Sequence, residues 1–198
     1  ELDEPMEMAF TGDGRMLFVE RKGNVKSVDL KTNAVKIIGF IPVNRIYTSK
    51  EGRVREAEEG LMGIAVHPHF EKNHWVYLYY ADKAEPKHVL ARWELKGDSL
   101  DQSSKKILLE IPTQRETCCH TGGGMVFDKD GDLFLTTGDN TGNPTAGTSG
   151  LDERPGRESW DDQRTAGNTN DLRGKILRIH PEDDGTYSIP EGNLFPPG

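Results

Sequence analysis

Cysteine is almost absent from this chain of 198 residues. The only two cysteines, Cys118 and Cys119, are neighbours in the sequence. Two adjacent cysteines cannot build the crosslinked framework of a small disulfide-rich domain, nor the spaced ligand pairs of a zinc ribbon. The fold must therefore depend on a hydrophobic core, for which 34% hydrophobic residues are sufficient.

Basic charge and long apolar runs are also lacking. The chain has 25 Lys and Arg against 33 Asp and Glu, a formal charge of −8. A surface that binds nucleic acid normally carries a basic excess, so no nucleic-acid partner is expected. The longest apolar run, Leu61–Val66, is far shorter than the roughly 18 residues of a membrane helix, so no membrane span is expected either.

Helical periodicity is scarce, whereas short runs of Val, Ile, Leu, Phe and Tyr recur between Asp-Gly or Asn turns. This pattern predicts an all-β fold. The expected strands are Met6–Phe10, Arg15–Glu20, Val25–Leu30, Val35–Ile41, Leu61–His67, Val76–Ala81, His88–Leu95, Lys106–Ile111, Met125–Phe127, Leu133–Thr137, Lys175–His180 and Thr186–Ile189.

An internal repeat indicates the architecture. The segment 10–19 matches the segment 127–136, and residues 67–79 are a looser third copy, so that Phe10, Phe70 and Phe127 are 60 and 57 residues apart. A unit of this length holds four short strands, the size of one β-propeller blade. The chain therefore covers about three blades of four-stranded antiparallel sheet. Because an arc of three blades leaves blade faces uncovered, we expect a longer propeller.

Both ends of the sequence favour the same interpretation. The chain begins at Glu1 rather than at Met, and it stops in a loop-like segment, residues 195–198. We expect residues 1–198 to be the N-terminal part of one propeller domain, truncated at both ends. A targeting peptide would be lost by such a cut, so the sequence itself assigns no compartment.

A long segment, residues 141–173, interrupts the strand pattern. It is rich in glycine and polar residues and includes Pro144 and Gly147. Loops of this length are usually functional or disordered. A disordered linker is one interpretation, but Trp160, Arg154 and Arg157 favour an ordered, hydrogen-bonded loop.

Chemistry-bearing residues are densest around His120. If segments 125–127 and 133–137 form a hairpin, its outer ends bring His120 close to Asp139. A carboxylate that orients an imidazole makes it an effective general base. The three glycines at 122–124 would permit close approach of something flat or bulky. The alternative is a surface histidine beside a glycine-rich turn.

Other residues could be taken for metal or redox sites. Cys118 and Cys119 can remain as two thiols or close a vicinal disulfide, whose flat surface could pack against a planar cofactor. The segment 128–132 superficially resembles a calcium loop, but a hairpin turn is the better interpretation because the acidic residue at position twelve is not Glu. His67 and His69 are interpreted as turn residues, because the sequence offers no third ligand nearby.

Taken together, the motifs resemble the glucose/sorbosone dehydrogenases, the family of soluble sugar dehydrogenases that depend on pyrroloquinoline quinone (PQQ) and of aldose sugar dehydrogenases. The resemblance is ordered and spans nearly the whole chain. It rests on the segments 59–70, 73–79, 120–123, 130–139, 172–179 and 189–195.

The resemblance implies a six-bladed propeller that binds PQQ and calcium and oxidises an aldose at its anomeric carbon to a lactone. The family's catalytic histidine opens a His-x-Gly-Gly segment, which here is His120, and its partner carboxylate matches Asp139. The resemblance also implies a small sugar substrate, an electron acceptor such as a cytochrome or quinone, and a periplasmic or extracellular location. The family's main PQQ and calcium contacts come from later blades, beyond residue 198.

The sequence departs from the family at three places. Glu58 stands where the family has a cofactor-contacting Gln, Gly124 stands where it commonly has Arg, and the Cys118–Cys119 pair is additional. Glu58, Cys118 and Cys119 are therefore the candidate cofactor-binding residues of this chain, with no metal ligand assigned.

Two alternatives to the dehydrogenase remain. One is a non-catalytic propeller that binds carbohydrate or a partner protein, which Glu58 and Gly124 would favour. The other is a lactonase with a metal held by channel-facing side chains, for which Asp139, Asn140, Asn168 and Asp171 are the candidates.

Overall fold

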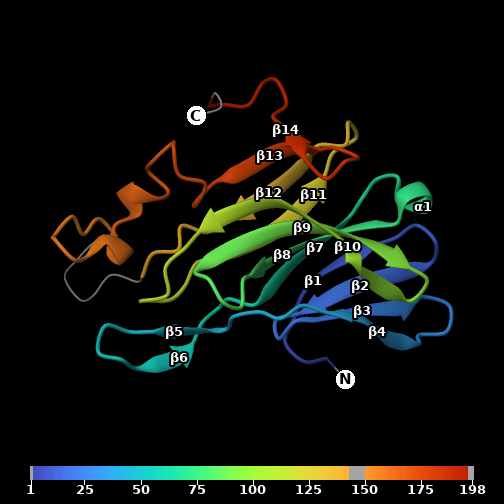
Figure 1. Cartoon of the computed structure of the whole chain (residues 1–198), viewed down its shortest axis with the longest axis horizontal. Helices are drawn as coiled ribbons and strands as arrows, with labels where there is room; N and C mark the ends of the chain where they lie inside the picture. The colour runs from blue at the N-terminus through green and yellow to red at the C-terminus, as the bar shows by residue number, and fades with distance from the viewer. Residues whose placement is uncertain (1, 143–149, 196–198) are drawn as a thin grey trace.

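The chain forms three four-stranded antiparallel sheets that stand side by side, in a computed structural model that describes residues 2–142 and 150–195 (Figure 1). In the first sheet the strands follow chain order, as expected for consecutive hairpins. They are β1 (Pro5–Phe10), β2 (Arg15–Glu20), β3 (Asn24–Asp29) and β4 (Val35–Phe40).

The second sheet also follows chain order and carries the longest strands. These are β7 (Leu61–Val66), β8 (Trp75–Ala81), β9 (Lys87–Lys96) and β10 (Ser99–Pro112), and the short helix α1 (Phe70–Asn73) links the first two. A separate hairpin, β5 (Ile46–Thr48) with β6 (Val54–Glu56), lies between the first two sheets in the sequence.

The third sheet consists of β11 (Gly122–Phe127), β12 (Leu133–Thr137), β13 (Ile176–Pro181) and β14 (Tyr187–Ser188). The long connection between β12 and β13 contains two single 3₁₀ turns, η1 (Glu158–Trp160) and η2 (Asp162–Arg164). No helix in the described ranges has both the length and the apolar character to cross a bilayer.

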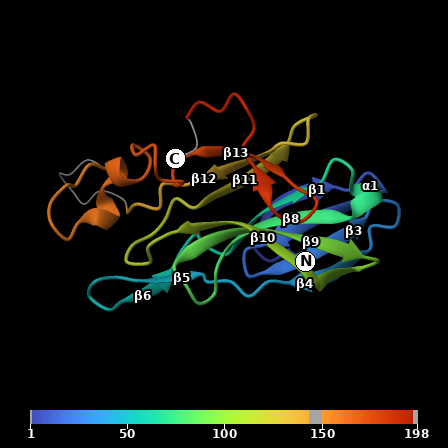
Figure 2. The same ribbon diagram turned by 45° about the horizontal axis from the view of Figure 1, so that its top comes forward.

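The first strands of the three sheets lie next to one another, with β7 between β1 and β11 (Figure 1; Figure 2 gives a turned view). Two hydrophobic cores fill the spaces between the sheets. Leu17, Ile64 and Trp93 belong to the core between the first and second sheets, and Tyr77 and Leu133 belong to the core between the second and third. Each such buried side chain contributes about 2 kcal/mol, so packing between sheets dominates the stability.

The outer faces of the first and third sheets keep apolar side chains exposed. Met8 and Phe10 on β1 are 55% and 62% exposed, and Val126 and Ile176 on the third sheet are 62% and 73% exposed. In the second sheet, both faces are covered by its neighbours. The all-β class and the three blade-like sheets are thus confirmed, and the uncovered faces are those of an arc of a propeller.

Several details differ from the expectation. The hairpin β5–β6 was not predicted, and β10 is longer than the expected Lys106–Ile111. In the looser repeat copy, the helix α1, which was not predicted, begins at Phe70 and stands where the other copies have an Asp-Gly turn.

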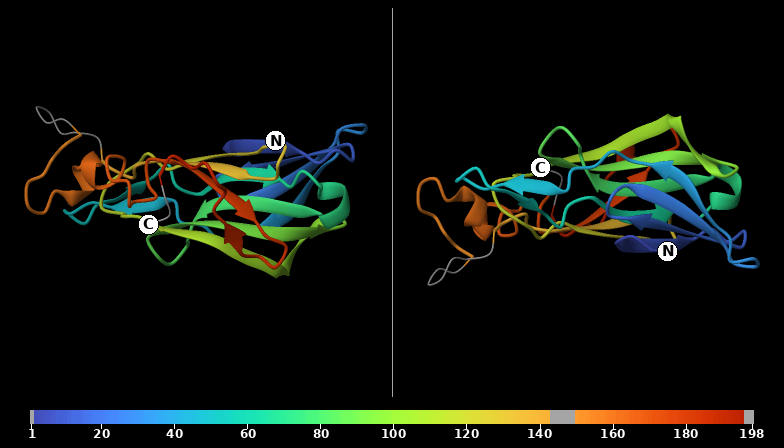
Figure 3. Two further views of the ribbon diagram at one scale, coloured as in Figure 1. Left: turned by 90° about the horizontal axis from the view of Figure 1, so that it is seen from above. Right: turned by 90° about the horizontal axis from the view of Figure 1, so that it is seen from below.

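Residues 141–142 and 150–173 of the connection are described and make hydrogen bonds to the rest of the chain or within the connection, while Pro144 and Gly147 fall in the range 143–149, outside the described residues. Asp152 accepts hydrogen bonds from Arg154 at 2.6 Å and from Arg157 at 3.0 Å. The connection lies at the same end of the molecule as the β5–β6 hairpin, opposite α1 (Figure 3). The predicted ordered loop is therefore confirmed for this part.

Candidate active site

The β11–β12 hairpin positions the candidate catalytic pair. Its register places Gly122 opposite Thr137 and Phe127 opposite Leu133, so the residues just outside it meet. There, Nδ1 of His120 lies 3.0 Å from Oδ1 of Asp139. The structure brings together the two residues that the hairpin argument pairs.

The backbone around this pair is tightly held. His120 and Asn140 both have positive φ angles, 57° and 56°, which is uncommon for residues other than glycine. The Asn140 N–H donates to the His120 carbonyl at 3.1 Å, and the Gly138 N–H donates to the Thr121 carbonyl at 3.1 Å. A Cβ atom on Gly138 would overlap the His120 carbonyl, so only glycine fits there.

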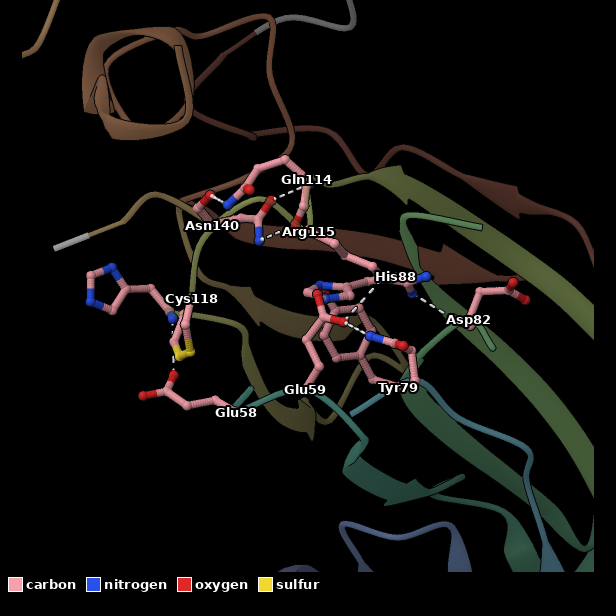
Figure 4. A network of polar contacts seen from close by, with 12 residues as sticks. Glu58, Glu59, Tyr79, Asp82, His88, Gln114, Arg115, Cys118 and Asn140 are labelled. Carbon is pink, nitrogen blue, oxygen red and sulfur yellow. Dashed lines mark hydrogen bonds and ion pairs between the residues drawn. A yellow bond between two sulfur atoms is a disulfide. The ribbon is translucent and has the colours of Figure 1, made fainter. Parts of the chain in front are cut away.

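The segment that follows β10 also holds this turn, through hydrogen bonds between Gln114 and Asn140. Oδ1 of Asn140 accepts a hydrogen bond from the Gln114 N–H at 2.6 Å, and Nε2 of Gln114 donates to the Asn140 carbonyl at 2.8 Å (Figure 4). These bonds fix the segment leading to Cys118 against the turn that carries Asp139. The side chains of the pair are therefore presented by a preorganised frame.

The histidine is accessible. Its side chain is 44% exposed, against 20% for Asp139. Because Nδ1 faces Asp139, a proton on Nδ1 donates to the carboxylate and leaves Nε2, on the other side of the ring, with a lone pair. This is the tautomer that a general base needs.

Glu58 is placed beside this pair, but it bonds to the protein. Its Oε2 accepts a hydrogen bond from the backbone N–H of His120 at 2.9 Å. Its side chain points toward Cys118 (Figure 4). The carboxylate thus supports the backbone of His120, a role that sequence reasoning did not assign to it.

In the structure, Cys118 and Cys119 are paired as a vicinal disulfide, one of the two states left open by the sequence. Both residues are partly exposed. The disulfide directly precedes His120, so its surface lies at the edge of the site.

The glycines that follow His120 serve chain packing. A Cβ atom on Gly123 would meet Met62, and one on Gly122 would meet the backbone at Gly138. On Gly63, a Cβ atom would overlap the Gly123 carbonyl. At Gly122 and Gly123, the close approach in the structure is between strands β7 and β11 and the 138 turn.

A buried polar network lies behind Glu58, and its centre is the next residue, Glu59. Oε2 of Glu59 lies 2.8 Å from Nδ2 of Asn44 and 3.3 Å from Nε of Arg115, and Oε1 lies 3.3 Å from Nε2 of His88. Nδ1 of His88 in turn lies 3.0 Å from the Tyr79 hydroxyl (Figure 4). Sequence reasoning missed this network, because its members come from separate segments without a recognisable spacing.

Electrostatics explains how a carboxylate can remain charged here. Burial acts to raise the pKa of Glu59, but hydrogen bonds from His88 and Asn44 and the charge of Arg115 outweigh it and hold the pKa below its usual value. Burial raises the pKa of Tyr79 far above its usual range, so its hydroxyl keeps its proton. The network ties Arg115, and with it the segment leading to His120, to the second sheet.

Of the candidates for a lactonase metal, Asn140 and Asn168 line one cavity, while the two carboxylates are engaged with other side chains. Asp139 is bonded to His120, and Asp171 pairs with Arg173 at 2.7 Å. In the described ranges, no three His, Cys, Asp or Glu side chains are placed to share a metal ion. His67 packs edge-on against Trp75 rather than joining such a group.

A cavity of about 420 Å³ adjoins the turn that follows Asp139, and neither His120 nor Asp139 is among the described residues that line it. Asn140 and Thr141, the residues that follow Asp139, form one wall, and the connection that contains η1 and η2 forms the other. The described residues that line it carry polar or charged side chains: Gln114, Asn140, Thr141, Glu158, Ser159, Arg164, Thr165, Asn168 and Arg173.

The propeller arc and its motifs define the class of protein. The sequence model of the family described as Glucose / Sorbosone dehydrogenase matches residues 2–197, and the chain belongs to this family. The resemblance deduced from the motifs is thereby confirmed.

The sequence identity to individual proteins is low. The chain is 25% identical to the Hedgehog-interacting protein of Mus musculus over 97% of its length, and 25% identical to quinoprotein glucose dehydrogenase B of Acinetobacter calcoaceticus, also over 97%. It covers 27% and 39% of these proteins. Among solved structures, the PQQ-bound form of aldose sugar dehydrogenase from Streptomyces coelicolor is 26% identical, with a TM-score of 0.67 over 99% of this chain and 49% of that one. The chain thus spans half or less of the length of these proteins.

Proposed function

We propose that this chain is the N-terminal part of a PQQ- and calcium-dependent dehydrogenase that oxidises an aldose at its anomeric carbon to a lactone. The observation that carries the proposal is the 3.0 Å contact between His120 Nδ1 and Asp139 Oδ1 at the end of the β11–β12 hairpin. Two relatives support the cofactor and substrate class through their names, a quinoprotein glucose dehydrogenase and a PQQ-bound aldose sugar dehydrogenase.

In this mechanism, Nε2 of His120 takes the proton from the anomeric hydroxyl of the sugar. Asp139 holds the ring in the correct tautomer and stabilises the imidazolium that forms. Glu58 and Asn140 hold the His120 backbone by hydrogen bonds to its N–H and its carbonyl. PQQ, when bound, would supply the two-electron acceptor that oxidation of the sugar to the lactone requires.

The residues present meet part of the cofactor's needs. The Cys118–Cys119 disulfide offers a flat, apolar surface beside the base, against which a planar quinone would pack. Glu58 already accepts a hydrogen bond from the protein backbone, and its negative charge would repel the carboxylates of PQQ. The contacts that neutralise PQQ, and the ligands of calcium, are therefore proposed to come from other blades.

The proposal includes a periplasmic or extracellular location and an electron acceptor such as a cytochrome or quinone. Such a location would keep a disulfide at Cys118–Cys119 oxidised, because disulfides persist in oxidising compartments.

The deciding experiment measures dye reduction by the complete propeller protein, loaded with PQQ and calcium, across a panel of aldoses. His120→Ala should lower kcat by about 10²–10⁴, the contribution of a positioned general base. His69→Ala, which changes an exposed histidine beside α1 at the opposite end of the molecule, is the matched control and should leave kcat unchanged. An equal rate in wild type and His120→Ala would refute the assignment.

A binding propeller without redox chemistry is the second candidate. It is favoured by the engagement of Glu58 with the protein backbone and by the match to a protein named for an interaction, the Hedgehog-interacting protein. A folded complete protein that oxidises none of the aldoses, yet retains a carbohydrate or protein ligand, would establish this candidate instead.

A further inference from the structure

The side chain of Asn140 pairs with the backbone of Gln114 as a neighbouring strand would. Its Oδ1 accepts a hydrogen bond from the Gln114 N–H at 2.6 Å, and its Nδ2 donates to the Gln114 carbonyl at 3.4 Å (Figure 4). In an antiparallel sheet, a residue holds its partner through the same two kinds of group, an N–H and a carbonyl. The Asn140 amide therefore fixes both the distance and the direction of the chain at Gln114.

The side chain of Gln114 returns this contact. Its Nε2 donates to the carbonyls of Asn140 at 2.8 Å and of Thr117 at 3.2 Å, and its Oε1 accepts from the N–H groups of Glu116 at 2.7 Å and of Thr117 at 3.0 Å. Two donated and two accepted bonds use the full capacity of a primary amide. We call the reciprocal bonds between Gln114 and Asn140 the amide clasp.

The amide clasp joins the two segments that carry the catalytic pair. His120 follows Thr117 in the same short segment, and Asp139 directly precedes Asn140. The Asn140 N–H also donates to the His120 carbonyl at 3.1 Å. Asn140 is only 3% exposed, so a group that lost its partner here would stay unsatisfied. The spacing between the imidazole and the carboxylate thus depends on the clasp.

Asparagine meets two needs at this position. The φ angle of Asn140 is 56°, a left-handed conformation that asparagine and glycine enter more readily than most other residues. The second need is the pairing with Gln114, which only the side-chain amide supplies. A glycine would meet the first need without the second, so Asn140→Gly separates the clasp from the backbone conformation.

We propose that Asn140 is a positioning residue for the catalytic pair and that it acts through the amide clasp. With the clasp closed, Nδ1 of His120 keeps its contact with Asp139, and Nε2 stays free to act as the base. The effect on rate rests on the proposed dehydrogenase function, whereas the tautomer of His120 can be measured without cofactor or substrate.

Nitrogen NMR of the isotope-labelled, PQQ-free complete protein reports this tautomer, with His120→Gln used to identify the signals of His120. Above neutral pH, wild type should carry the proton on Nδ1. Asn140→Gly should shift it toward Nε2, because a displaced imidazole no longer donates to Asp139. Gln114→Met, which keeps the length of the side chain but removes its four hydrogen bonds, should do the same.

Steady-state kinetics of the PQQ-loaded complete protein tests the effect on rate. Counted per bound PQQ, kcat for an aldose should fall about tenfold or more in Asn140→Gly, because small displacements of a catalytic group have large effects. KM should stay unchanged, since no bond to the sugar is removed. A purely structural role would instead lower Tm and the PQQ-loaded fraction, and leave kcat per bound PQQ at the wild-type value.

A double variant tests whether the two residues act together. Asn140→Gly combined with Gln114→Met should lose less than the product of the two single effects on kcat, because both changes open the same clasp. Thermal unfolding followed by circular dichroism establishes that each variant is folded, and Gln114→Met carries the test if Asn140→Gly does not fold.

Asn33→Gly is the matched control. Asn33 also has a positive φ angle, 59°, and it lies in the exposed turn between β3 and β4 of the first sheet. Its replacement makes the same chemical change at the same backbone conformation, far along the chain from the clasp. The tautomer of His120 and kcat should both stay at their wild-type values.

The inference would be overturned by a wild-type His120 with its proton on Nε2, or by folded Asn140→Gly and Gln114→Met proteins with the wild-type tautomer. If the tautomer shifts in the variants but wild type oxidises no aldose, the dehydrogenase function fails and the positioning role stands. If wild type oxidises aldoses and the variants keep its kcat per bound PQQ, the positioning role fails and the dehydrogenase stands.

Discussion

The carboxylate of Glu58 accepts a hydrogen bond from the backbone N–H of His120 at 2.9 Å, although 62 residues separate the two in the chain. His120 has a left-handed backbone conformation that costs a residue with a Cβ atom about 1 kcal/mol. Two hydrogen bonds offset part of this cost: the His120 N–H donates to Glu58, and the Asn140 N–H donates to the His120 carbonyl. The position of the imidazole therefore depends on a residue of a different blade.

Removing this acceptor should misplace the base. We expect Glu58→Ala to lower kcat about tenfold or more, because small displacements of a catalytic group have large effects on rate. Glu58→Gln keeps an oxygen at the same place and should remain within about threefold of wild type. Steady-state kinetics on one aldose measures both, and a Glu58→Gln variant as impaired as Glu58→Ala would show that the negative charge matters rather than the hydrogen bond.

Asp139 should be needed for its charge as well as its position. In Asp139→Asn the amide can still accept a hydrogen bond from Nδ1, but it does not stabilise the imidazolium, so we expect kcat to fall about a thousandfold. Asp130→Asn, in the exposed turn at the other end of the same hairpin, is the control and should retain full activity. Pre-steady-state reduction of the cofactor would show whether the loss lies in the chemical step.

Gly138 should tolerate no side chain. Gly138→Ala places a methyl group against the His120 carbonyl, and we expect a destabilisation of about 2 kcal/mol, or roughly 4–8 °C in Tm. In Gly124→Ala the new methyl group meets only Oγ1 of Thr136, at 3.2 Å, so its Tm should stay near that of wild type. Differential scanning calorimetry of the two variants tests this, and equal Tm values would contradict it.

The Glu59 network should make stability depend on pH. The pKa of Glu59 is lower in the folded chain than its usual value near 4.5, so its contribution is complete above about pH 4.5 and is lost as the pH falls through the folded-state pKa. Glu59→Gln should lower the free energy of unfolding by about 3 kcal/mol at pH 7, because Arg115 and His88 lose their charged partner. It should also reduce the loss of stability in acid.

Urea denaturation between pH 7 and pH 3 measures this dependence. Glu56→Gln changes an exposed carboxylate three residues away and serves as the control, with a pH profile parallel to that of wild type. If Glu59→Gln also ran parallel to wild type, the network would not be the source of the acid sensitivity.

Much of the fold could be predicted from the sequence because most strands pair with the next strand along the chain. Consecutive strands pair across short turns, and repeated Phe and Asp-Gly positions mark β1–β2 and β11–β12 as equivalent hairpins. The same locality brought His120 next to Asp139 in the prediction. In the third copy of the repeat, α1 stands where the other copies have an Asp-Gly turn. The sequence did not predict this helix, because the only sign of a difference was the looser spacing of the third copy.

What escaped prediction depends on contacts between segments far apart in the chain. Glu59 contacts Asn44, His88 and Arg115, which come from three separate segments of the chain. No periodicity in the sequence marks these residues as neighbours. The role of Glu58 is hidden for the same reason, because its partner is a backbone N–H in another blade. The glycines at 122 and 123 suggested a ligand, but the groups that need the space are backbone atoms of strand β7 and the 138 turn.

Glu58 and Glu59 are chemically alike and adjacent, yet one supports the site and the other is enclosed behind it (Figure 4). Deletion of one residue between Glu59 and β7 would shift both side chains by one position, so that Glu58 takes the place of Glu59 and Ala57 takes the place of Glu58. The His120 N–H would then lose its acceptor, because Ala57 has no carboxylate. The number of residues between β6 and β7 therefore matters for function. Loops grafted onto this blade should keep that number unchanged.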